Sequence, residues 1–241
     1  GIQASYYKSV EDAQIKSVMK ATINKELEVV LSWRDLFISD PIKELDRKDK
    51  FLIGVRTKMS TEEKKERTSA KSDISQDWEK LRNNSQLNGE TFVERLKKES
   101  NGYALAIKNE FTRYIINAAR GIATPEDTRR LLNIAGYPLS WWERYTGKSD
   151  LKSIEFYESD TFKRIPAIDV HTQLISKLIS DHEKIKPSDI MDINQISAIL
   201  PYAHYMVTDG SMRDRIVYKL KLDKKYDVKI IKLDQLEEVL D

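Results

Sequence analysis

The segment that most constrains the fold is the stretch at residues 187–212, PSDIMDINQISAILPYAHYMVTDGSM. Apolar residues recur at helical spacing over residues 189–199. Pro201 ends this helix, because the residue before a proline is pushed out of the helical region. The run YMV at residues 205–207 is typical of a short strand, and a turn signal follows it at Asp209. The segment therefore predicts a helix, a short connection and a strand with an acidic end.

The acidic residues of this segment are expected to lie close together. A helix packed on the strand that follows it runs antiparallel to that strand. At ~1.5 Å per helical residue and ~3.3 Å per strand residue, both elements are about 16 Å long. The helix start, with Asp189 and Asp192, should therefore lie beside Asp209. Carboxylates that converge at the carboxyl end of a strand favour an oxygen-liganded cation, Mg²⁺ or Mn²⁺.

A structural interpretation of the same acids stays open. Ser188 or Asp189 can cap the helix, and acidic residues at a helix N-terminus are favoured by the helix dipole alone. Asp209 precedes a glycine, which is a common turn pair. The pattern is thus typical both of a metal site and of ordinary helix and turn chemistry.

The phrase DIMDINQISAILPYAHYMVTDGSM resembles the C-terminal motif of PIN-like domains, which are metal-dependent ribonucleases. In that motif an Asp opens an apolar helix, and the following strand ends in Thr/Ser-Asp. Here Asp192, with Asp189 beside it, and Thr208-Asp209 hold those positions. LPYAHYMVTD is similar to a bacterial PIN-like branch that carries LPYCD before the strand. The resemblance is clear over roughly residues 155–232 and weaker over 20–60.

The resemblance implies an α/β fold, in which helices flank a mainly parallel, Rossmann-like sheet. The helical pattern of the middle of the chain is not a standard part of such a core, so we expect a large helical insertion and a helix-rich chain overall. The expected organisation has three parts, namely an N-terminal part of the α/β core at 1–56, a helical insertion or cap at 57–153 and a C-terminal part of the core at 154–241. The strands expected to share the sheet are 27–31, 204–208 and 228–231.

The resemblance also implies an activity, an endoribonuclease that hydrolyses phosphodiester bonds with an Asp-bound Mg²⁺ or Mn²⁺. Asp192 and Asp209 would be the catalytic metal ligands and Asp189 a supporting ligand. Thr208 would orient a metal-bound water through its hydroxyl. The expected partners are a nucleic acid, specifically RNA, and a protein inhibitor or other protein. The alternative is a non-catalytic, degenerate PIN-like module that binds protein or nucleic acid and uses its acids as caps.

Two departures from the family pattern bear on the site. Ile38 stands where the family carries an acid, so Asp35 and Asp40 are the additional candidates. No apolar strand ending in Asp precedes residue 11, although that strand supplies the central ligand in PIN-like domains. We therefore expect this strand to lie upstream or to be lost, and the 241 residues alone to be inactive.

Composition narrows the classes of protein further. Hydrophobic residues make up 40% of the chain, charged residues 33%, and the net charge is +2, so bulk charge alone implies no nucleic-acid partner. The chain has no cysteine, which excludes disulfides and thiolate zinc sites and agrees with a cytoplasmic location. No apolar run approaches the ~20 residues of a membrane span. Neither His171 nor His182 has a second His or Cys at the spacing that a zinc site needs, so no zinc site is expected. Trp141 and Trp142 are expected in the core.

Overall fold

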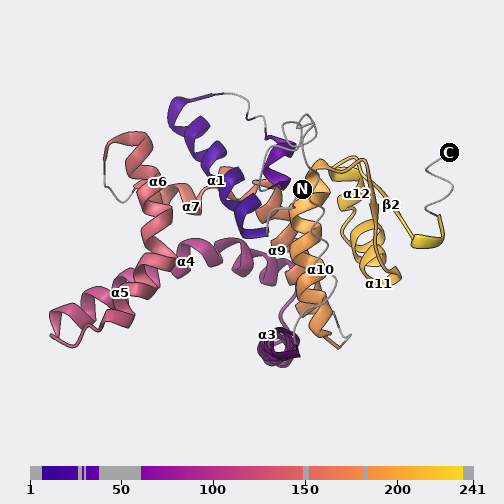
Figure 1. The fold of residues 1–241 in the computed structure, drawn as a ribbon, viewed down its shortest axis with the longest axis horizontal. Helices are drawn as coiled ribbons and strands as arrows, with labels where there is room; N and C mark the ends of the chain where they lie inside the picture. Colours follow the sequence, from indigo (N-terminus) through magenta and orange to yellow (C-terminus); the bar gives the residue numbers. More distant parts are fainter. Residues whose placement is uncertain are drawn as a thin grey trace.

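The computed structural model describes the chain in the ranges 7–26, 29, 31–37, 61–148, 152–181 and 184–235. The described chain is mainly helical, and a single pair of short strands is present in those ranges (Figure 1). The elements of the first half are α1 (Tyr7–Asn24), η1 (Trp33–Leu36), α3 (Thr61–Leu87), α4 (Phe92–Ala119), α5 (Pro125–Leu131), η2 (Leu132–Gly136) and α6 (Tyr137–Thr146).

The second half adds four further α-helices before the sheet and short helical turns around it. Its elements are α7 (Lys152–Glu158), α8 (Asp160–Lys163), α9 (Pro166–Ser180), α10 (Pro187–Ile199), η3 (Leu200–Tyr202), β1 (Tyr205–Val207), α11 (Gly210–Arg213), η4 (Asp214–Lys219), α12 (Leu222–Lys225), β2 (Lys229–Ile231) and η5 (Leu233–Gln235). None of the helices in the described ranges combines the length and the apolar character that a bilayer crossing demands.

Local capping explains where α4 and α5 begin. Thr91 and Glu94 form a reciprocal capping box, in which the Thr91 hydroxyl accepts the Glu94 N–H and the Glu94 carboxylate accepts the Thr91 N–H at 2.8 Å. Thr124 and Asp127 repeat this arrangement ahead of α5, with Pro125 at the first helical position.

The predicted helical character of the 57–153 block is confirmed in its described residues.

The sheet is smaller than the sequence predicts. Strands β1 and β2 pair in parallel with Met206 opposite Ile230, so the predicted strands near 205 and 229 and their parallel arrangement are confirmed. The third expected strand, 27–31, lies largely outside the described residues, and the two residues of it that are described are not in a strand. The described chain is therefore mainly helical with a small two-strand parallel sheet, and a larger Rossmann-like sheet stays a prediction.

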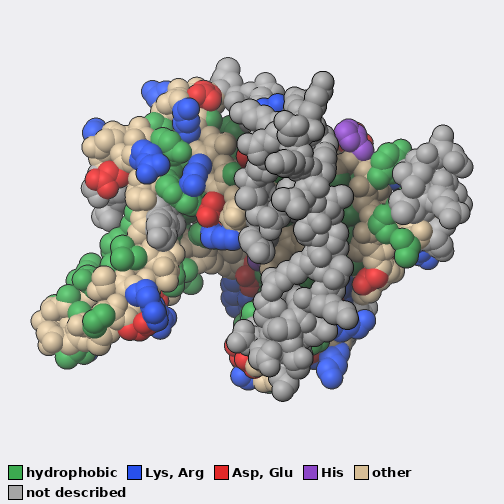
Figure 2. All heavy atoms as spheres, in the orientation of Figure 1, with side chains coloured by type: hydrophobic (Ala, Val, Ile, Leu, Met, Phe, Trp, Pro, Cys, Tyr) green, Lys and Arg blue, Asp and Glu red, His purple; other side chains and the backbone are tan. Residues whose placement is uncertain are grey.

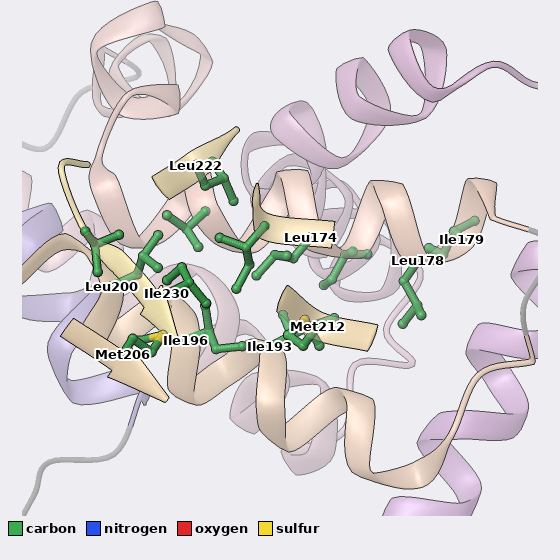
Figure 3. Packing of buried hydrophobic residues seen from close by; sticks show 14 of the residues in the cluster. Leu174, Leu178, Ile179, Ile193, Ile196, Leu200, Met206, Met212, Leu222 and Ile230 are labelled. Carbon is green, nitrogen blue, oxygen red and sulfur yellow. The ribbon is translucent and has the colours of Figure 1, made fainter. Parts of the chain in front are cut away.

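Two hydrophobic clusters stabilise this arrangement. The first packs α9 and α10 against the β1–β2 pair, and Figure 3 shows Ile196 near Met206 and Ile193 near Met212. The second cluster is rich in aromatic residues and joins α1, α4, α7, α8 and the start of α9. Both clusters mix residues of more than one of the three expected parts, so that division of the chain stays a prediction.

Candidate functional site

Asp189 is buried in the first turn of α10, where its carboxylate serves the helix itself. The N-cap residue is Lys186, not Ser188 or Asp189 as the sequence predicts. The Lys186 N–H donates to Asp189 Oδ2 at 2.7 Å, and Arg215 Nη1 lies 3.8 Å from Asp189 Oδ1. A backbone donor and a buried guanidinium thus compensate the charge of this carboxylate.

A second buried carboxylate, Asp181, extends the same ionic network. Lys177 Nζ lies 2.8 Å from Asp181 Oδ1, and Lys219 Nζ lies 3.2 Å from Asp181 Oδ2. Arg215 Nε lies 3.9 Å from Asp181 Oδ2, so this arginine faces both acids. We call Asp181, Asp189, Arg215 and the two lysines the α9–α10 ion network. It ties the end of α9 and the start of α10 to the π-helical turn η4, and its acids are neutralised by side chains.

Asp209 follows β1 directly and is exposed. It is the N-cap of α11, and its Oδ1 accepts the Met212 N–H at 2.8 Å. Thr208 is half-buried, and its N–H donates to Ile231 O at 3.3 Å, which extends the parallel ladder by one bond. Asp192 is half-buried in the second turn of α10.

Of the two additional acidic candidates, the structure describes only Asp35, which lies away from Asp209. Asp35 is half-buried in η1, and burial raises the pKa of its carboxyl group. Burial raises the pKa of Tyr202 to about 12, and the charge of Asp35 adds to that rise, which places Asp35 near the segment that enters β1. Asp209 follows the opposite end of this strand. Asp40 lies outside the described residues.

The expected convergence of Asp189, Asp192 and Asp209 is not seen. Within the described residues, no group of three or more acidic or histidine side chains is placed to hold a metal ion. The physical reason is visible at Asp189, whose carboxylate turns to Lys186 N and Arg215.

A hollow of the described surface lies elsewhere, between α1, α4, η2 and α6. It has a volume of about 580 Å³, within the range of roughly 300–1,000 Å³ that is usual for small-molecule sites. Its lining combines apolar and charged side chains, namely Lys8, Asp12, Lys16, Gly102, Tyr103, Ala106, Ile107, Asn133, Ile134 and Trp141. We call it the α1–α4 hollow. Asn133 and Ile134 belong to a π-helical turn, a local widening that is frequent at functional sites.

One end of this hollow holds a closed polar network. Lys8 Nζ lies 3.0 Å from Glu11 Oε1 and 2.8 Å from Asp12 Oδ1, and it donates to the Tyr103 hydroxyl at 2.7 Å. The Tyr103 hydroxyl in turn donates to the buried Glu11 carboxylate. Burial opposes the charged form of Lys8, but the attraction of Glu11 and Asp12 is stronger and raises the pKa of the ammonium group.

Lys16 has a different environment at the same hollow. Its Nζ lies over the ring of Trp141, 4.5 Å from the ring centroid. Across the described residues, no acidic side chain forms an ion pair with this ammonium group. A half-buried cation that rests on an aromatic face keeps N–H donors available for a further anionic group.

A smaller hollow of about 180 Å³ adjoins the first and shares Gly102 and Tyr103 with it. His171 lines it, and His171 Nε2 donates to Asn194 Oδ1 at 3.1 Å. Burial lowers the pKa of His171 to about 4, and the hydrogen bond to Asn194 offsets part of that effect. This histidine is therefore neutral at pH 7 and links α9 to α10.

The sequence pattern did not identify the α1–α4 hollow. One available signal was the spacing of Lys8, Asp12 and Lys16, which at intervals of four residues share one face of a helix. The partner Trp141 is far away in the sequence, and its contact with Lys16 depends on the packing of α6 on α1. Trp141 is half-buried at the edge of the aromatic cluster, so it belongs to the core only in part.

No protein-family profile matches the sequence, and neither the curated proteins nor the solved structures contain a match to it.

Proposed function

We propose that this chain is a non-catalytic binding module whose ligand site is the α1–α4 hollow. The observation that supports this proposal most is the contrast in how charge is used in the two regions. The buried acids near α10 are compensated by a backbone N–H, Arg215 and lysines. In the hollow, Lys16 rests on Trp141 beside about 580 Å³ of space.

The acids of the C-terminal region have structural roles that need no cation. Asp189 closes the first turn of α10, and Asp209 caps α11. Capping of this kind is worth about 1 kcal/mol at each helix. These roles agree with the alternative in which the acids serve as caps and the module binds a partner without catalysis.

A neutral aromatic probe tests whether the hollow is a binding site. We expect 2-naphthamide to bind saturably to the intact chain and to change the fluorescence of Trp141. Gly102→Leu is the matched blocking variant, because a Cβ at Gly102 meets nothing within 4 Å and the larger side chain would occupy the hollow. Saturable binding that Gly102→Leu abolishes supports the proposal. Failure to bind, or binding that Gly102→Leu leaves unchanged, would contradict it.

The second candidate function is a PIN-like endoribonuclease that hydrolyses RNA with Mg²⁺ or Mn²⁺. The observation that favours it is the exposed Asp209 at the carboxyl end of β1, in a parallel strand–helix–strand unit. A cation there would activate a water and stabilise the charge that develops on the phosphate. In this proposal Asp192 and Asp209 bind the metal, Asp189 supports them, and Thr208 orients the water.

RNA cleavage by the intact chain tests this second candidate. The substrate is a labelled single-stranded RNA, incubated with Mg²⁺, with Mn²⁺ and with excess chelator. Cleavage that needs the cation and disappears in Asp209→Asn would favour the nuclease over the binding module. Cleavage that persists equally in Asp209→Asn would point to a contaminating enzyme and would remove the support for this site.

A further inference from the structure

Two lysines among the described residues line the α1–α4 hollow, and only one of them is available to a ligand. Lys8 is surrounded by Glu11, Asp12 and the Tyr103 hydroxyl. Lys16 lies over Trp141, and no acidic side chain among the described residues forms an ion pair with it. A charged group from a ligand would therefore find its partner at Lys16.

The sign of that charge follows from both ends of the hollow. Glu11 and Asp12 are already paired with Lys8, so a cationic ligand would gain little from either carboxylate, although Asp12 lies one helical turn from both Lys8 and Lys16. At the Lys16 end, an ammonium group with three N–H donors can form charge-assisted hydrogen bonds to a carboxylate or phosphate. The hollow thus favours an anionic group at one end.

The walls between these ends define the rest of the ligand. Ala106, Ile107 and Ile134 supply apolar surface from α4 and η2, and Trp141 supplies an aromatic wall from α6. Aromatic faces stack on flat rings, and apolar walls favour a body without charges of its own. Asn133 is the one amide side chain among the described residues of the lining and can orient a polar substituent.

We infer that the α1–α4 hollow binds a planar organic anion, with its ring against Trp141 and its carboxylate or phosphate on Lys16. The inference rests on the proposed function in one respect, since it takes the hollow to be the ligand site. It adds the chemical class of the ligand and assigns Lys16 as the residue that determines specificity.

The test compares probes that share one ring system and differ in charge. Isothermal titration calorimetry of the intact chain measures 2-naphthoate, 2-naphthyl phosphate and neutral 2-naphthamide. We expect either anion to bind about tenfold tighter than the amide, the gain that a charge-assisted hydrogen bond gives. The better of the two anions distinguishes a carboxylate ligand from a phosphate ligand.

Three variants separate the role of Lys16 from general effects. Lys16→Met should remove the preference for anions while the amide still binds, and Lys16→Arg should restore it. Lys20→Met is the matched control, because Lys20 is exposed one turn further along α1 and does not line the hollow. The control should keep the full preference.

Each outcome decides between the inference and the proposed function. Equal affinity for anion and amide in the wild-type chain, with both blocked by Gly102→Leu, overturns the inference and leaves the hollow as a neutral ligand site. A preference for anions that survives Lys16→Met assigns the charge recognition to another residue and also overturns it. Anion binding that Gly102→Leu leaves unchanged overturns both, because the site then lies outside the hollow.

Discussion

The α9–α10 ion network and the α1–α4 hollow both contain charged side chains but use them differently. In the network, Asp181 and Asp189 are buried and face Arg215 and two lysines, so the charges hold three elements together. In the hollow, Lys16 rests on Trp141 beside open volume. Figure 2 shows both lysine and arginine side chains and hydrophobic side chains on the described surface near α6. The difference indicates that charge near α10 stabilises the fold, whereas charge at the hollow is available for binding.

The largest expected effect is a loss of stability when a cation is replaced by methionine, and it should differ between the two regions. Arg215→Met removes a buried cation that faces Asp181 and Asp189, and we expect it to lower the free energy of unfolding by about 3 kcal/mol. Lys16→Met removes a cation–π contact and should cost about 0.5 kcal/mol. Urea denaturation followed by circular dichroism measures both. Equal losses would show that Lys16 is as structural as Arg215.

The next effect is a dependence of stability on pH that His171 causes. Because the folded-state pKa of His171 is lowered to about 4, the unfolded chain binds more protons between pH ~6.5 and 4. The free energy of unfolding is therefore fully retained above pH ~6.5 and falls as the pH decreases toward 4. For this half-buried ring the loss should be at most about 3 kcal/mol. His171→Gln should remove that slope, and an unchanged slope in this variant would assign it to other groups.

A smaller effect tests whether Asp209 is only a cap. Asp209→Ala loses the bond to the Met212 N–H and should cost about 1 kcal/mol, whereas Asp209→Asn retains a capping acceptor and should change stability by only a few tenths. Thermal unfolding without added cation measures both variants. A loss of more than about 1 kcal/mol in Asp209→Asn would mean that the charge has a partner beyond α11.

The smallest effect is a gain in stability from a substitution at the rim of the hollow. Gly102 lies within α4, and a Cβ built there meets nothing within 4 Å. Gly102→Ala should therefore raise the free energy of unfolding by about 0.5–1 kcal/mol, because alanine restricts the unfolded chain and favours the helix. Differential scanning fluorimetry detects such a change. A loss of stability would indicate that the hollow is narrower than its lining residues suggest.

Much of the secondary structure could be predicted from local sequence signals. Thr124-Pro125 marks a helix start that the structure confirms, and the helix at 189–199 and the run at 205–207 lie within α10 and β1. The interiors of these elements depend on periodicity and capping, which a short window of sequence contains. The ends of the elements differ more from the prediction, since α10 has its N-cap at Lys186 and not at Ser188 or Asp189.

The candidate site could not be predicted to the same extent, because it depends on tertiary packing. Matched lengths predict Asp189 near the end of β1, but its carboxylate accepts the Lys186 N–H and faces Arg215 from η4. The contact between Lys16 and Trp141 joins α1 to α6, and no local pattern indicates it. The π-helical turn that contributes Asn133 and Ile134 likewise has no sequence signal that we recognise.

The most direct test of this account is one nuclear magnetic resonance titration of the intact, isotope-labelled chain with 2-naphthoate and then with Mg²⁺. The indole N–H of Trp141 reports on the hollow, and the amide of Met212 reports on Asp209. The account predicts a saturable shift of the Trp141 signal with 2-naphthoate and no saturable shift of Met212 with Mg²⁺. A saturable Mg²⁺ shift at Met212, with a Trp141 signal that stays unmoved by 2-naphthoate, would contradict it and favour the metal-dependent nuclease.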